Sequence, residues 1–225
     1  KNVDAAEKAL FEQALHLQEQ ATFGAAKKAW ITYLRDYIGF QSYNLARYNA
    51  ALTMFHLGEY SSSKSLLFEV LESLRQNEDH HPLAEYNSFF ETDVRLLTAE
   101  VLIQLNQYEE ALSITHEVRP DPEAEESSAI FRNKTALGRE LYHPTSILQD
   151  FRLWLVRTRV YVAKGNFKQA VNSLEKSNLV LNHYSRTYNP RDKTVDDKGF
   201  PPYLLKANIG LRAIEYRVKY CKSEF

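Results

Sequence analysis

The side chains that could perform chemistry in this sequence are widely scattered. His80 and His81 stand beside Glu78 and Asp79, which is the nearest approach to a set of metal ligands. Because adjacent residues point to different sides of a helix, the two imidazoles are not spaced to hold one ion on a helix face. We interpret this segment as a solvated loop and expect no metal site.

Nucleophiles and phosphate-binding loops are equally hard to find in the sequence. The single cysteine, Cys221, lies at the end of an amphipathic stretch, where a structural role is more common than a catalytic one. The seven glycines are isolated from one another, so none belongs to a loop that cradles phosphate. Glu109 and Glu110 form a carboxylate pair, but they begin a predicted helix and favour its dipole. We therefore expect a protein that is not an enzyme and has no cofactor.

The formal net charge of -1 hides an asymmetry along the chain. Residues 1–131 contain 10 Lys and Arg against 21 Asp and Glu, whereas residues 132–225 contain 18 against 8. Two oppositely charged halves can steer charged partners, although drift in the composition of solvated helix faces would give the same pattern.

One cysteine excludes an internal disulfide, and no apolar run has the length of a membrane span. We expect a cytoplasmic protein, with the nucleus as a second location.

The basic C-terminal half raises the alternative of RNA binding. Basic residues next to tyrosines could combine phosphate contacts with base stacking. Tyr161, however, falls on an apolar stripe that is expected to face inward, so we favour a protein partner over nucleic acid. The residues that an RNA contact would use are Arg157, Arg159, Lys164, Lys168, Arg186 and Arg191 with Tyr161, Tyr184 and Tyr188.

A short pattern recurs four times and predicts the elements that position these residues. It has a small or turn-forming residue, an aromatic residue two positions later, and a small residue three positions after the aromatic. Another small or compact residue lies seven positions before each start, and Gly165 can supply the left-handed turn that ends a helix. Each copy predicts a helical hairpin whose two helices approach closely. The copies start at Ala21, Gly58, Asn106 and Gly165, and the preceding small residues are Ala14, Ala51, Ala99 and Thr158.

The pattern predicts an all-α chain that forms one continuous domain over residues 1–225. The starts of the copies are increasingly far apart, so the insertions between hairpins grow toward the C-terminus. Long loops of this kind are more often binding elements or disordered segments than plain connections. The predicted hairpins are residues 3–37, 43–76, 83–118 and 147–182, the long loops are 119–146 and 183–202, and the last helix is 203–221.

The recurring pattern resembles the tetratricopeptide repeat (TPR) superfamily, which places a small residue, an aromatic and an alanine at these offsets. The proline that separates the family's units is replaced here, which leaves the ends of the second helices less defined. The resemblance implies a TPR-like α-solenoid of about four helical hairpins plus a C-terminal helix. It also implies a protein-interaction scaffold. The residues at the proline positions are Ile38, Arg75, Glu123 and Asn182.

Local strings resemble a narrower family, the tenth subunits of the CCR-NOT deadenylase complex. They are residues 47–60, 101–112, 157–174 and 204–208. This resemblance implies a scaffold that pairs with subunit 11 and docks on the large NOT scaffold subunit, contributing to mRNA deadenylation without catalysing it. It also implies further repeats after Cys221. The alternatives are an unrelated TPR adaptor in trafficking or secretion and an RNA-contacting helical repeat module.

Repeat arrays usually bind along the concave surface that their stacked units create. Polar residues on the predicted first helices are therefore our candidates for contacts with a protein partner. The apolar stripe on the last predicted helix either caps the array or forms an interface with a further unit or a partner. The groove candidates are Arg47, Asn49, Arg95, Arg157 and Arg159, and the helix-end candidates are Leu211, Ile214 and Val218.

Overall fold

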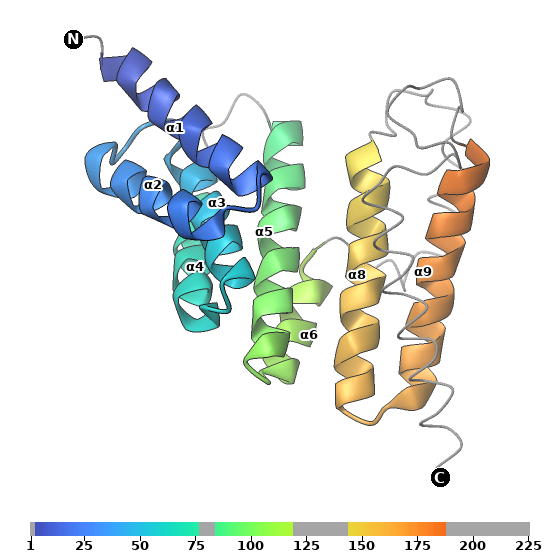
Figure 1. Cartoon of the computed structure of the whole chain (residues 1–225). Helices are drawn as coiled ribbons and strands as arrows, with labels where there is room; N and C mark the ends of the chain where they lie inside the picture. The colour runs from blue at the N-terminus through green and yellow to red at the C-terminus, as the bar shows by residue number, and fades with distance from the viewer. Residues whose placement is uncertain (1–2, 77–83, 119–143, 188–225) are drawn as a thin grey trace. The chain divides into compact units, whose positions relative to one another are not determined.

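The computed structural model describes residues 3–76, 84–118 and 144–187, and its regular structure over these ranges is α-helical throughout (Figure 1). The chain divides into two compact units, Lys1–Gln107 and Tyr108–Phe225, where the sequence predicted one continuous domain. The boundary falls inside the hairpin predicted for residues 83–118. The helices are α1 Val3–Glu19, α2 Phe23–Asp36, α3 Tyr43–His56, α4 Tyr60–Gln76, α5 Ala84–Gln104, α6 Tyr108–His116, α8 Pro144–Ala163 and α9 Phe167–Thr187.

The four turn residues of the recurring pattern all adopt the left-handed backbone conformation. Their φ angles are 56° at Ala21, 77° at Gly58, 58° at Asn106 and 72° at Gly165. In each turn, the N–H after the turn residue donates to the carbonyl five residues earlier, over 2.8 to 3.0 Å. This is the Schellman motif, which satisfies carbonyls that a helix end would otherwise leave unpaired. The left-handed turn predicted at Gly165 is confirmed.

The aromatic and small residues of the pattern have the same role in every copy. Each aromatic is the first residue of the helix that follows the turn, from Phe23 in α2 to Phe167 in α9. In the second hairpin the Ser63 hydroxyl donates to the Ala51 carbonyl over 2.8 Å, so the two small residues are in direct contact. The small residues that are completely buried are Ala14, Ala26, Ala51, Ser63, Ala99, Ala111, Thr158 and Ala170.

The left-handed turn at Ala21 leads to a first prediction. A residue with a Cβ atom pays about 1 kcal/mol or more in this conformation, which glycine avoids. We expect Ala21→Gly to raise the free energy of unfolding by about 1 kcal/mol, measured by urea unfolding followed by tryptophan fluorescence. Gly58→Ala is the matched control and should have the opposite sign, because an added Cβ there has nothing within 4 Å and meets only the backbone penalty. A loss of stability in Ala21→Gly would contradict this account.

The described part of the first unit contains the helices α1 to α5, each packed against the next in the chain. Trp30 and Tyr33 of α2 are fully buried among small alanines, and the ring of Phe11 meets them edge-on at centroid distances of 5.1 and 5.6 Å. A second cluster joins Leu67 and Val70 of α4 to apolar residues of α5. The core therefore runs through the unit from one hairpin to the next.

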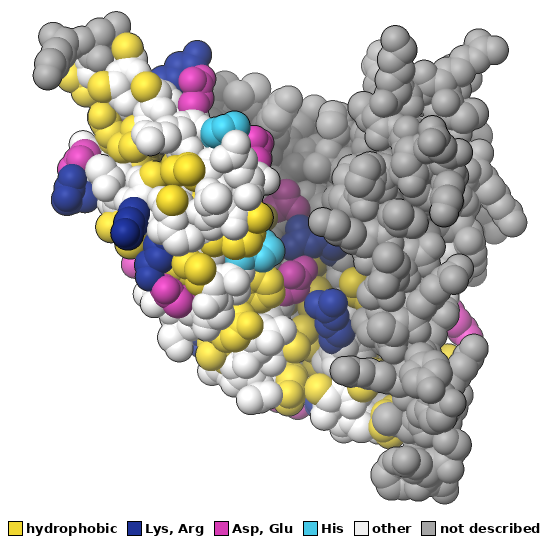
Figure 2. Space-filling model, viewed as in Figure 1, with side chains coloured by type: hydrophobic (Ala, Val, Ile, Leu, Met, Phe, Trp, Pro, Cys, Tyr) yellow, Lys and Arg dark blue, Asp and Glu magenta, His cyan; other side chains and the backbone are white. Residues whose placement is uncertain are grey.

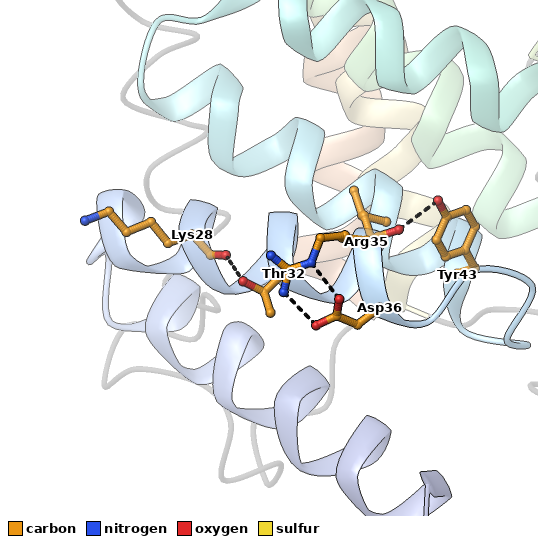
Figure 3. Close-up of polar contacts among 6 residues, drawn as sticks. Lys28, Thr32, Arg35, Asp36 and Tyr43 are labelled. Carbon is orange, nitrogen blue, oxygen red and sulfur yellow. Dashed lines mark hydrogen bonds and ion pairs between the residues drawn. The ribbon is translucent and has the colours of Figure 1, made fainter.

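Polar contacts close the connection between α2 and α3 (Figure 3). The hydroxyl of Tyr43, the first residue of α3, donates to the Leu34 carbonyl near the end of α2 over 3.1 Å. Arg35 donates to both carboxylate oxygens of Asp36, over 2.6 and 2.8 Å, and these hydrogen bonds lower the pKa of Asp36. Tyr43 thus pairs one of the carbonyls that the helix end leaves without an intrahelical donor.

Tyr33 makes stability depend on alkaline pH. Its burial and its hydrogen bond to Glu7 raise the pKa of its hydroxyl well above the ordinary value of 10.0. As the pH rises, the Tyr33 hydroxyl loses its proton in the unfolded chain before it does so in the folded protein. The stabilisation that the protonated Tyr33 hydroxyl gives to the fold is therefore complete below about pH 10 and is lost as the pH rises through the folded pKa. We expect the stability advantage of the native protein over Tyr33→Phe to stay constant up to about pH 10 and to shrink as the pH rises above that value, measured by urea unfolding. An advantage that does not change with pH would contradict the assignment.

In the second unit, the long helices α8 and α9 form a hairpin and α6 packs on α8 (Figure 1). Trp154 and Val160 of α8 and Leu174 of α9 are buried in this hairpin. The Lys164 ammonium lies 2.5 Å from a carboxylate oxygen of Glu109, which links the end of α8 to the start of α6.

Candidate functional site

A shallow groove of about 800 Å³ runs along α4 in the first unit. Its lining residues on α4 recur every three or four positions, so they share one face of the helix, opposite the buried Ser63, Leu67 and Val70. Its volume lies within the range of small-ligand pockets, although the groove is open to solvent. The lining residues are Arg47 of α3 with Ser61, Lys64, Ser65, Phe68, Glu69, Glu72, Ser73 and Gln76 of α4.

Arg47, which the sequence analysis predicted as a partner contact, lines this groove. Its guanidinium is 3.4 Å from the Glu69 carboxylate and donates to the Asn44 side-chain oxygen over 3.4 Å. The same group lies 4.5 Å from the centre of the Tyr43 ring. These contacts orient Arg47 and compensate its charge.

Lys64 lies in the half of the groove nearer the start of α4, and Phe68 lies at the middle of the helix. The Phe68 side chain is 40% exposed, and the Lys64 ammonium lies 5.3 Å from the centre of its ring, within the distance of a cation–π interaction. Lys64 also donates to the Gln107 side-chain oxygen over 3.0 Å. The sequence analysis missed both residues. The available signal was that Phe68 directly follows Leu67 and so falls off the inner stripe of α4.

Carboxylates occupy the other half of the groove. Glu69 and Glu72 are about half exposed, and Glu72 is paired with Arg75 at 3.7 Å and accepts a hydrogen bond from Gln76 over 2.9 Å. With Arg47 and Lys64, the lining carries two positive and two negative charges. Charges of both signs are also interspersed over the face of the first unit seen in Figure 2. A neutral lining lacks the excess of positive charge that binding to a nucleic-acid backbone requires.

The predicted contact Asn49 is only 8% exposed and belongs to a polar network that joins three helices. Its side-chain oxygen accepts from Gln18 of α1 over 2.9 Å, and its amide donates to the Leu45 carbonyl over 2.9 Å. The Gln18 oxygen in turn accepts from Trp30 over 3.0 Å and from Thr53 over 2.8 Å. In this structure the polar atoms of Asn49 are therefore engaged within the fold.

Arg95 of α5 is paired with Glu91, one turn earlier on the same helix, at 2.5 Å. Its side chain is mostly buried, with 16% of its surface exposed. The contacts described for the three predicted residues of the first unit differ: Arg95 pairs with Glu91, Arg47 with Glu69, and Asn49 with Gln18.

Arg157 of α8 is completely buried in the second unit. Its guanidinium donates to the hydroxyl and the carbonyl of Thr115, each over 3.2 Å, and lies 3.2 Å from the Nδ1 atom of His116. Because a guanidinium only donates, this imidazole nitrogen must accept. Arg157 thus places a cation at the C-terminal end of α6, where the helix dipole favours positive charge. Arg159, two residues later, is exposed.

The helix-end candidates Leu211, Ile214 and Val218 lie outside the described residues, as do His80, His81 and most of the two predicted long loops. The partner-binding role of all eight predicted residues stays a prediction. Within residues 3–76, 84–118 and 144–187, no cluster of three His, Cys, Asp or Glu side chains is arranged to hold a metal ion. No helix in these ranges has the length and apolarity of a membrane span.

The repeated turns and buried small residues agree with the structural comparisons. The chain superposes with a TM-score of 0.53 on a putative kinesin light chain from Podosopora anserina with nearly identical TPR-like repeats. The two are 15% identical, and the match covers 95% of this chain and 96% of that one. The fold is a TPR-like α-solenoid.

A second TPR-like neighbour leads to the same fold. The chain superposes with a TM-score of 0.51 on a double mutant of RS-1 MamA, at 12% identity, over 94% of this chain and 95% of that one. No protein-family model matches the sequence, and neither does any curated protein. Similarity at these identities concerns the fold, so the partner has to be argued from the surface of this chain.

Proposed function

We propose that this protein is a non-catalytic scaffold that binds protein partners through its helical repeats. The observation that carries the proposal is the TPR-like fold, in which the same Schellman turn recurs at four places in the chain, each flanked by buried small residues at the same offsets. Stacked repeats of this kind present extended surfaces to other proteins. The neutral groove along α4 further favours a protein partner over a nucleic acid.

We further propose that the scaffold is a subunit of the CCR-NOT mRNA deadenylation complex in the cytoplasm. Its partners there would be subunit 11 and the large NOT scaffold subunit. The support for this finer assignment is the resemblance of residues 47–60, 101–112, 157–174 and 204–208 to the tenth subunits of that complex. Residues 47–60 span most of α3 and the turn into α4, so the resemblance includes Arg47, which lines the groove.

The test is affinity purification of the full-length protein from its native cells, followed by mass spectrometry. Recovery of subunit 11 and the large NOT subunit is the expected result. A different stable set of proteins would overturn the CCR-NOT assignment and favour an adaptor in trafficking or secretion. If no protein partner co-purifies, and RNA binds instead with an affinity that falls steeply with salt, the scaffold proposal is wrong.

A further inference from the structure

We infer that two lysines at equivalent positions of the repeat couple neighbouring helices of the first unit, so that each restrains the local opening of the next. Lys27 of α2 donates to Glu59, and Lys64 of α4 donates to Gln107. These two contacts are called the lysine bridges below. The inference goes beyond the proposed function, because it concerns how the hairpins of the scaffold are held together, whichever partner it binds.

The first lysine bridge joins the α1–α2 hairpin to the turn between α3 and α4. Lys27 lies six positions after the left-handed turn residue Ala21, and Glu59 directly follows the next turn residue, Gly58. The Lys27 ammonium lies 2.6 Å from both carboxylate oxygens of Glu59. The two side chains are 29% and 38% exposed, so they are partly withdrawn from water. Hydrogen bonds between two charged groups are stronger than those between neutral groups.

The second lysine bridge has the same offsets one repeat later. Lys64 lies six positions after the turn residue Gly58, and Gln107 directly follows the turn residue Asn106. The Lys64 ammonium donates to the Gln107 side-chain oxygen over 3.0 Å, which joins α4 to the end of α5. Gln107 is the last residue of the first unit, so both lysine bridges lie within that unit. The repeated offset indicates a feature of the repeat rather than an isolated surface contact.

A ring stack lies next to the first lysine bridge. Phe23, one helical turn before Lys27 on α2, stacks on His56 at the end of α3, with ring centroids 4.5 Å apart and an angle of 13° between the rings. His56 lies three positions before Glu59. The ring stack and the ion pair therefore join the same stretch of α2 to the same turn of the next hairpin.

The second unit has different residues at the equivalent positions. The residue six positions after the turn residue Asn106 is Leu112, which has no donor, and the residue after the last turn residue is Asn166. The Asn166 amide donates to Gln169 within its own turn over 2.8 Å. The ion pair between Lys164 and Glu109 has the roles exchanged, because the lysine lies beside the turn and the carboxylate on the earlier helix. Among the described residues, the lysine bridges are thus confined to the first unit.

Hydrogen exchange of the full chain, followed by mass spectrometry of its peptides, tests the first lysine bridge. Within the described residues α1 and α2 pack on each other and on α3, so this junction controls their local opening. We expect Lys27→Met to speed exchange in α1 and α2 about twofold to fivefold, since methionine keeps the length of the side chain and removes the charge. Lys28→Met is the matched control. Lys28 is exposed, and the hydrogen bond that the structure shows for it is made by its backbone carbonyl.

Charge exchange separates the bridge from other effects of substitution. Lys27→Glu and Glu59→Lys each place two like charges in contact, so each should speed exchange in α1 and α2. The double variant restores an ion pair and should exchange more slowly than either single variant. Gln107→Glu turns the second lysine bridge into an ion pair and should slow exchange in α5 about twofold to fivefold. This gain should disappear when Lys64 is replaced by methionine. Circular dichroism checks that each variant is folded.

Equal exchange in Lys27→Met and Lys28→Met, or a double variant that exchanges as fast as the single variants, would overturn the inference. A gain from Gln107→Glu that persists without Lys64 would overturn it for the second bridge. The proposed function fails separately, when the purification from native cells recovers no protein partner.

Discussion

Replacing Arg157 by alanine is expected to lower the free energy of unfolding of the second unit by about 3 kcal/mol. The substitution removes the guanidinium donor from the Thr115 hydroxyl and from the Nδ1 atom of His116 and opens a void beside Trp154. The Thr115 carbonyl then keeps only the N–H of Val118, at 3.5 Å. Urea unfolding followed by the fluorescence of Trp154 measures the effect. The measurement is made in a Trp30→Phe background, because the chain has only two tryptophans. All tryptophan fluorescence then comes from Trp154.

Arg159→Ala is the matched control for this experiment. Arg159 is exposed on the same helix, so its loss should change stability by no more than about 0.5 kcal/mol. Arg157→Met should cost less than Arg157→Ala, because it fills the void and removes the cost of burying a charge. Equal stabilities of Arg157→Ala and Arg159→Ala would contradict the role assigned to the buried guanidinium. Arg159→Ala also tests the predicted partner contact without disturbing the core.

Trp30→Ala should have the largest effect in the first unit, a loss of about 3 to 5 kcal/mol. Trp30 is completely buried in the first hydrophobic cluster, meets Phe11 edge-on, and donates its indole N–H to Gln18. A loss of this size is comparable to the total stability of many small domains. Thermal unfolding followed by circular dichroism measures it, and Trp154 then reports separately on the second unit.

Trp30→Phe separates the packing of the ring from its hydrogen bond. It keeps an aromatic ring in the cluster and removes the donor to Gln18, so we expect a loss of about 1 to 2 kcal/mol. Trp30→Phe and Gln18→Ala both remove this hydrogen bond, so the double variant should lose less stability than the sum of the two single variants. Additive losses, or equal losses in Trp30→Phe and Trp30→Ala, would show that the hydrogen bond does not couple α1 to α2.

The sequence predicted the helical hairpins because each one depends on short-range geometry. A left-handed turn residue, an aromatic at the next helix start and small residues seven positions before and five after the turn lie within one hairpin. This spacing can therefore be recognised in the sequence without knowledge of how the other helices pack. Ala21 and Asn106 show how strong the pattern is, since both adopt a conformation that side chains usually avoid.

The candidate contact residues were harder to predict, because exposure depends on elements that are distant in the sequence. Arg157 lies on the first helix of the hairpin predicted for residues 147–182. The C-terminal end of α6, about forty residues earlier in the chain, covers it and accepts its hydrogen bonds. Asn49 is buried for the same reason, because Gln18 of α1 reaches its side chain. Only Arg47 among the five groove candidates lies in the groove along α4.

The sequence by itself therefore determined the all-α class, the hairpin turns and the resemblance to TPR repeats, since all of these follow from local spacing. The tertiary structure alone decided which polar side chains are internal and which are available to a partner. It buried Arg157 and Asn49 against neighbouring helices and left Phe68 exposed beside Lys64. The physical reason is that helical periodicity defines the faces of a helix, whereas the packing of other helices decides which faces meet water.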